Sequence, residues 1–123
     1  MSVAAFIVAE RDIDGFDSFV NGKSVILYQN QIDQACRILN VTPLFAFLSS
    51  PPGEWAEFFE EDQVPAEKWY PPSEGLKTVR ALRRYIQEQK GVLEPILSDL
   101  EEYDNVLTRL EQEQVRWHLQ IDY

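Results

Sequence analysis

The residues best suited to binding chemistry form a basic cluster in the second half of the chain. Five of the eleven Lys and Arg residues fall within one short segment: Lys77, Arg80, Arg83, Arg84 and Lys90. Lys77, Arg80 and Arg84 follow one another at steps of three and four residues, so a helix would place them on one face. Guanidinium groups on such a face bind carboxylates or phosphates in a bidentate manner. The simpler interpretation is internal pairing with the acidic segments 54–62 and 99–104, or plain solvation.

An acidic run precedes the basic cluster. Its carboxylates are Glu54, Glu57, Glu60, Glu61 and Asp62. Oxygen ligands of this kind suit calcium, but the run lacks the alternating Asp/Asn positions and the glycine of an EF-hand loop. An exposed helix face is the simpler interpretation. A surface of this charge would also suit an inhibitor or immunity-like protein that blocks a basic enzyme.

His118 is the only histidine and Cys36 is the only cysteine. One histidine cannot build a histidine-based metal cluster, and one cysteine cannot form an internal disulfide. Cys36 falls on the apolar stripe of a predicted helix, and no nucleophile-elbow glycine pattern is present. We therefore expect both residues to be structural, and we predict no catalytic residue, cofactor or metal. A small anionic ligand or substrate held by Arg80, Arg84 and His118 is the alternative.

Large aromatic residues lie around the acidic run and before the basic cluster. They are Trp55, Phe58, Phe59, Trp69 and Tyr70. Core packing is the first interpretation, because a chain of this size needs its large aromatics to fill a core. Any that stay exposed would form an aromatic patch suited to a protein interface. The candidate interaction surface is therefore Trp69, Tyr70, Lys77, Arg80 and Arg84, and the secondary candidates are Glu54, Glu57, Glu61 and His118.

The two ends of the chain predict strands that could support these groups. Residues 3–9 are a continuous apolar run, typical of a strand buried on both faces. Residues 115–123 alternate strictly between apolar and polar side chains, which predicts a strand with one wet face. Because two strands alone are marginal in water, we expect them to pair under the helices, or to find a third strand locally or across a dimer.

Between these strands, apolar residues recur mostly at helical spacing. The expected helices cover residues 24–39, 44–48, 54–62, 73–90 and 92–113, with turns or loops at 12–17, 49–53 and 63–72. The expected caps are Ser24, Thr42 and Ser73, and the core stripe of the basic helix is Leu76, Val79, Leu82 and Ile86. Asn21-Gly22 would also suit a hairpin over residues 16–28, and the choice between hairpin and helix stays open, with helix preferred.

Length and charge bound the class of protein. A chain of 123 residues predicts one domain, 1–123, of α+β class, mostly helical, with about four to five helices packed on a small antiparallel sheet. The net charge of −10 argues against nucleic acid and against anionic membranes as partners. The apolar runs are shorter than the ~20 residues of a membrane span, and the first residues lack the charged start of a signal peptide. We therefore expect a soluble cytoplasmic protein.

Two segments resemble a family of small uncharacterised bacterial proteins that is associated with cyanobacteria. They are residues 69–82, WYPPSEGLKTVRAL, and residues 116–123, RWHLQIDY. The resemblance implies a cytoplasmic bacterial protein and favours helix over hairpin near Val25. The family has no assigned activity, so the resemblance transfers no site.

Together these observations favour a non-enzymatic protein-interaction or regulatory module with an acidic surface. The expected partner is another protein, and a homodimer is left open.

Overall fold

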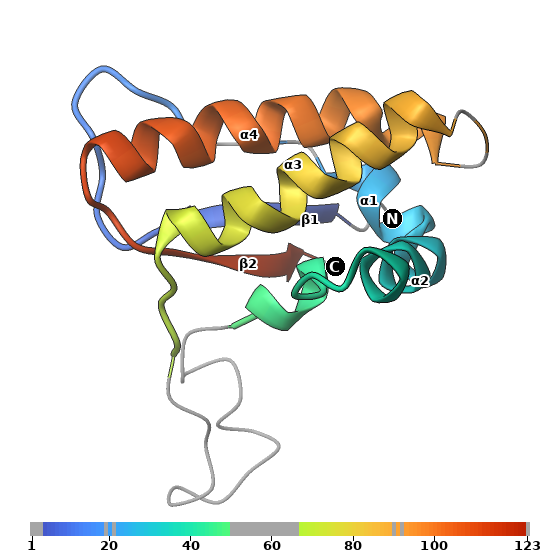
Figure 1. Cartoon of the computed structure of the whole chain (residues 1–123). Helices are drawn as coiled ribbons and strands as arrows, with labels where there is room; N and C mark the ends of the chain where they lie inside the picture. The colour runs from blue at the N-terminus through green and yellow to red at the C-terminus, as the bar shows by residue number, and fades with distance from the viewer. Residues whose placement is uncertain are drawn as a thin grey trace, which may run out of the picture.

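The computed structural model describes residues 4–18, 20, 22–49, 67–89, 91 and 93–122 (Figure 1). In chain order, its elements are β1 (Ala4–Ala9), α1 (Lys23–Leu27), α2 (Gln29–Leu39), the 3-10 helix η1 (Leu44–Phe47), α3 (Pro72–Glu88), the 3-10 helix η4 (Glu94–Ile96), α4 (Leu97–Gln112) and β2 (Trp117–Asp122). The predicted class is confirmed, because the chain is mostly helical and its N- and C-terminal strands form a small antiparallel sheet. Within these ranges no helix is long and apolar enough to cross a bilayer.

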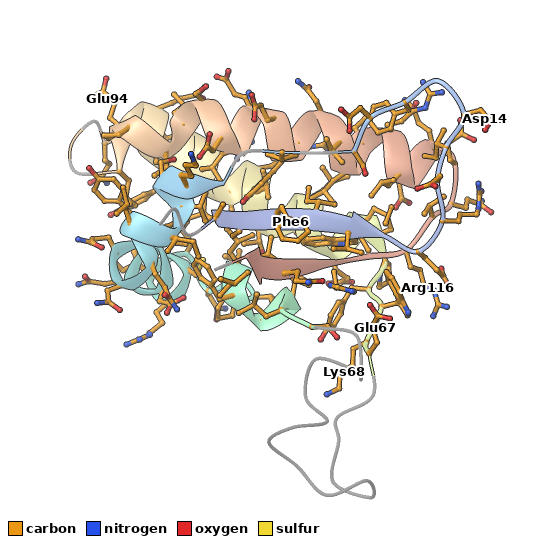
Figure 2. The ribbon with its side chains drawn as sticks, turned by 180° about the vertical axis from the view of Figure 1, so that it is seen from behind. Phe6, Asp14, Glu67, Lys68, Glu94 and Arg116 are labelled. Carbon is orange, nitrogen blue, oxygen red and sulfur yellow. The ribbon has the colours of Figure 1, made fainter. Side chains whose placement is uncertain are left out.

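Strands β1 and β2 are antiparallel, with Ile7 opposite Leu119 and Val8 opposite His118. Ile7 and Leu119 are buried on the face of the sheet that α3 and α4 cover (Figure 1). Phe6 points away from those helices (Figure 2), and both Phe6 and Val8 are only partly buried. The prediction that the first strand is buried on both faces is therefore wrong, because α3 and α4 form a single layer on one face of the sheet.

The second edge of β2 is also paired. Leu48 forms a parallel bridge with Leu119, and Tyr70 forms an antiparallel bridge with Trp117. The Tyr70 N–H donates to the Trp117 carbonyl at 2.8 Å, and the Trp117 N–H donates back at 3.0 Å. The two terminal strands therefore pair under the helices, as expected, and β2 also gains short local partners.

Helices α3 and α4 form an antiparallel pair over the sheet (Figure 1). The predicted stripe of α3 is confirmed, since its buried residues include Leu76, Val79, Leu82 and Ile86. Gly75 permits the closest approach to the sheet: a Cβ at this position would lie 2.3 Å from Cζ2 of Trp117. The predicted final helix is confirmed over residues 97–112, but its first turn is η4, which contains Pro95.

The helical interpretation of the segment after Asn21 is confirmed over residues 23–39, although Tyr28 divides it into α1 and α2. Gly22 serves a purpose other than a hairpin turn. A Cβ on Gly22 would lie 1.8 Å from the Ala5 carbonyl oxygen and 2.2 Å from the Tyr103 hydroxyl, so glycine lets α1 begin directly against β1. The Tyr103 hydroxyl donates to that same carbonyl at 2.6 Å.

The three predicted N-caps are wrong. The observed cap positions are Gly22 for α1, Pro43 for η1 and Pro71 for α3, and none has a capping side-chain bond. Ser24 donates instead to Asp99 of α4, and the Ser73 N–H donates to Glu111 of α4. The Ser24 side chain and the Ser73 N–H, which could have taken part in local capping, bond to α4 instead.

Candidate functional site

The basic face of α3 divides into an internally paired part and an exposed part. Arg80 and Arg83 both reach Asp104 of α4: Arg83 Nη1 lies 2.8 Å from Oδ2, and Arg80 Nε lies 3.2 Å from the same oxygen. Thr108 donates to the other carboxylate oxygen of Asp104 at 3.0 Å. Arg80 and Arg83 therefore pair internally with segment 99–104, which is one of the interpretations that the sequence allowed.

Electrostatics favours the charged form of Asp104. Burial by itself would raise the pKa of this carboxyl, but hydrogen bonds from Arg80, Arg83 and Thr108 outweigh that effect and hold the pKa below its usual value. The cluster fastens α3 to α4. The Arg80 side chain is 57% exposed, but its guanidinium group is already paired with Asp104.

Lys77 and Arg84 lie on the solvent-facing side of α3. The Lys77 side chain is 72% exposed, and its ammonium lies 3.6 Å from Glu74, a surface pair of little energetic weight. Arg84 is exposed, and within the described residues it has no hydrogen bond or ion pair. These two side chains are the part of the predicted basic face that remains free to meet a partner.

His118 occupies a closed site on the outer face of β2. It is fully buried, and its Nε2 lies 2.7 Å from Oε2 of Glu67, while its Nδ1 lies 3.1 Å from the Leu119 carbonyl oxygen. The Trp69 ring covers it, with ring centroids 4.6 Å apart. The predicted wet face of this strand is therefore wrong at His118, which Glu67 and Trp69 cover, whereas Arg116 on the same predicted face is exposed.

The His118 site joins two segments of the chain that are distant in sequence. Both ring nitrogens face acceptor oxygens, so the imidazole holds Glu67 against β2. Sequence reasoning missed Glu67 because it stands 51 positions from His118, and only the fold brings the two together. Arg80 and Arg84 project from α3 on the other side of the sheet, so the three-residue anion site of Arg80, Arg84 and His118 is not assembled.

Trp69 and Tyr70 are half-buried and face inward. The Tyr70 ring meets Phe47 of η1 edge-on at 5.2 Å between centroids, and Phe47 stacks in turn on Trp117 at 5.0 Å. This is the core-packing interpretation of the aromatics, and it makes segment 67–71 an anchored strap along β2. Trp69 and Tyr70 thus contribute less open surface than an aromatic docking patch requires.

Several candidates lie outside the described residues, namely Glu54, Glu57, Glu61, Trp55, Phe58, Phe59 and Lys90. Cys36 is fully buried, and burial raises the pKa of its thiol, which keeps it protonated and unreactive. In the ranges that the structure covers, no group of three or more His, Cys, Asp and Glu side chains could hold a metal ion.

Exposed apolar side chains of the described residues lie elsewhere, at the end of α1 and on the outer side of α2. Leu27 and Ile38 are 77% and 63% exposed, and they are the two large exposed hydrophobic residues of the described chain. Beside Ile38 runs a groove of about 330 Å³ between α2, the end of α3 and Leu93. Its lining residues within the described ranges are uncharged: Gln31, Gln34, Ala35, Ile38, Tyr85, Gln89 and Leu93.

A sequence signal for this surface was available and was missed. Gln31, Gln34 and Ile38 of α2 follow at steps of three and four residues, so they share one helical face. That face differs from the buried stripe of Ile32, Ala35 and Cys36. An isoleucine on the solvent side of an amphipathic helix could have been recognised, but the groove beside it needs Tyr85 and Leu93, which only the fold supplies.

Comparison with known proteins adds no further evidence, because no protein-family model, curated protein or solved structure matches this chain. The resemblance to a family of small bacterial proteins stays a prediction.

Proposed function

We propose that this protein is a non-enzymatic protein-interaction module that docks its partner on the outer face of α2. This surface, here called the α2 face, consists of Ile38 and the other described residues of the groove beside it. The observation that carries the proposal is the well-exposed Ile38 beside a groove whose described lining residues carry no charge, in a chain whose net charge is −10.

The composition of the α2 face is that of an interface centre. The buried centre of a protein interface contains few charged residues and keeps aliphatic and aromatic side chains. Here 26% of the chain is charged, yet the lining residues of the groove that the structure describes are all uncharged. Contiguous exposed apolar surface with a polar rim marks sites of association, and Gln31, Gln34 and Gln89 supply that rim.

The non-enzymatic part of the proposal is supported by His118, Asp104 and Cys36, whose side chains are buried or already paired. In the described ranges, His118 is closed off by Glu67 and Trp69, and Asp104 is held by two arginines. Cys36 is buried with a raised pKa. A lone protonated cysteine is also in keeping with a reducing cytoplasm, where we propose that the protein acts.

The test places a photoreactive phenylalanine analogue at Ile38 and, as a control, at the exposed Asn105 of α4. Irradiation in cells should give a discrete crosslinked protein adduct from position 38 and none from position 105. Both side chains project from well-formed helices, so the fold is kept in each variant. Equal adduct patterns from the two positions, or no adduct from either, would rule out the α2 face as the docking surface.

The exposed basic side of α3 is a second candidate surface, as the sequence predicted in part. Lys77 and Arg84 are free to meet an acidic partner, whereas Arg80 is held by Asp104. Replacing Lys77 and Arg84 by Glu should abolish binding of such a partner, and binding of the unaltered protein should weaken with added salt. The acidic-inhibitor alternative rests on Glu54, Glu57 and Glu61, and no observation in the described residues favours it.

A further inference from the structure

We infer that the strap of residues 67–71 is a pH-sensitive element, held most firmly on β2 when the His118 ring carries a proton on both of its nitrogens. The inference is independent of the α2 face. His118 is the only histidine of the chain, and histidine is the side chain whose charge ordinarily changes between about pH 5 and 8.

Two kinds of bond hold the strap on β2. Tyr70 and Trp117 exchange backbone bonds at 2.8 and 3.0 Å, and the indole N–H of Trp117 donates to the Pro71 carbonyl at 3.3 Å. These bonds involve no ionisable group, so they do not change with pH. The bond between Glu67 and His118 joins two ionisable side chains, and it is the part of the attachment that responds to protons.

The surroundings of the His118 ring require two donors. Nε2 lies 2.7 Å from Oε2 of Glu67, and Nδ1 lies 3.1 Å from the Leu119 carbonyl oxygen. A carbonyl and an ionised carboxylate only accept, whereas a neutral imidazole has one N–H and one lone pair. A neutral ring therefore directs a lone pair at one of the two oxygens. The imidazolium donates to both, and its bond to the carboxylate is charge-assisted.

Burial opposes a charge on this ring, and two neighbours compensate for that cost. His118 is fully buried, whereas the side chain of Glu67 is 23% exposed, so water still reaches the carboxylate. The carboxylate at 2.7 Å makes the pair neutral as a whole. The Trp69 ring, with its centroid 4.6 Å from that of His118, favours a cation further, because aromatic faces attract positive charge within about 6 Å.

Other charged groups around His118 keep their charge over this pH range. The strap also carries Lys68, which is exposed, and β1 and β2 are followed and preceded by Glu10 and Arg116, which pair at 2.9 Å. The hydrogen bond from Arg116 holds the pKa of Glu10 below its usual value, so Glu10 stays ionised. Residues 44–49 contain no ionisable side chain. Within the described ranges, the pH response of the strap therefore comes from His118.

Hydrogen exchange of the Tyr70 amide measures how often the strap separates from β2, because this N–H donates to Trp117. After correction for the intrinsic pH dependence of exchange, its protection should fall by about tenfold between about pH 5 and 8, as one net hydrogen bond is lost. Protection that stays constant or rises over this range overturns the inference.

Glu67→Gln separates the proton-dependent bond from the rest of the strap. Its side-chain amide can donate to the lone pair of a neutral ring, which leaves the Nδ1 proton for Leu119. The protection of the Tyr70 amide should then no longer fall as the pH rises. Glu101→Gln removes the same charge from an exposed position of α4 and should keep the pH dependence of the unaltered protein. If Glu67→Gln kept it as well, the inference would be wrong.

Nitrogen NMR spectra of the His118 ring measure its protonation directly. At about pH 5 both ring nitrogens should give the chemical shift of a protonated nitrogen, and at about pH 8 only one of them should. A ring that is neutral at the lower pH, while the Tyr70 amide is protected, contradicts the inference, and so does a ring that stays doubly protonated at the higher pH.

Discussion

Single residues in this protein owe their roles to partners that are remote in sequence. Asp104 is the clearest case, because it accepts hydrogen bonds from Arg80 and Arg83 of α3 and from Thr108 of its own helix. Two of the five basic residues that made the cluster conspicuous in the sequence are thus paired with one carboxylate. Among the described residues of the cluster, Lys77 and Arg84 remain for a partner. Arg83, next to Arg84, shows how closely a structural residue and a binding residue can resemble each other in sequence.

Asp104→Asn should lower the free energy of unfolding at pH 7 by about 1–3 kcal/mol, because it weakens charge-assisted hydrogen bonds to two arginines. The pKa of Asp104 is lower in the folded chain than in the unfolded chain. Its stabilisation is therefore complete above the unfolded-state pKa of ~3.9 and is lost as the pH falls through the folded-state pKa. Urea titrations from pH 7 downwards should show the difference between the two proteins narrowing below that value.

The matched control is Glu101→Gln, an exposed carboxylate on the same helix. It should change stability by less than about 0.5 kcal/mol at any pH. If the two substitutions changed the free energy of unfolding equally, the pairing of Asp104 with the arginines of α3 would contribute nothing to stability.

At the scale of the elements, close contacts explain features that turn and capping rules do not. The glycines before α1 and within α3 are required because β1 and Trp117 occupy the space where a Cβ would lie. Segment 67–71 is held along β2 by the Tyr70 bridge and by the bond between Glu67 and His118. The strap and α3 therefore both pack on the sheet, and Trp117 of β2 contacts each of them.

Gly75→Ala should destabilise the protein even though alanine is the better helix former. The gain in helix propensity is about 1 kcal/mol, and a Cβ 2.3 Å from a ring atom of the buried Trp117 costs more than that through overpacking. Thermal unfolding should show a lower Tm, with a changed near-ultraviolet tryptophan signal.

Gly91→Ala is the control for this element, since its Cβ would meet no atom closer than 4.0 Å. Its Tm should stay within a degree or so of the unaltered protein. A Gly75→Ala protein as stable as this control would mean that α3 can move away from Trp117 at no cost.

At the scale of the whole molecule, excess negative charge governs both folding and association. The 21 Asp and Glu residues exceed the 11 Lys and Arg residues, and several of the basic side chains are engaged in ion pairs. Repulsion among the remaining carboxylates acts against the compact state and against contact between copies. The described residues of the α2 face, none of them charged, stand out against this background.

Raising NaCl from about 0.01 M to 0.2 M should raise the Tm by a few degrees, because the range of charge repulsion contracts from about 30 Å to under 10 Å. Calorimetry at low protein concentration would measure this on the monomer. The double variant Glu101→Lys, Glu102→Lys is less acidic and should respond less to salt. An unchanged or falling Tm in the unaltered protein would mean that ion pairs such as Arg83 with Asp104 outweigh the general repulsion.

The sequence by itself determined the α+β class, the two terminal strands and the buried stripe of α3. These follow from short-range periodicity: the run of residues 4–9 and the stripe Leu76, Val79, Leu82 and Ile86 show which face is apolar without reference to any partner. It also determined the net charge of −10.

Only the tertiary structure decided which polar residues are free. Arg80 and Arg84 are alike in sequence, but α4 brings Asp104 to one and not to the other. His118 sits on the polar side of an alternating strand, yet Glu67 and Trp69 close over it. Burial and pairing depend on contacts between distant segments, which local spacing does not encode, and this is why the α2 face emerged only when Tyr85 and Leu93 were placed beside Ile38.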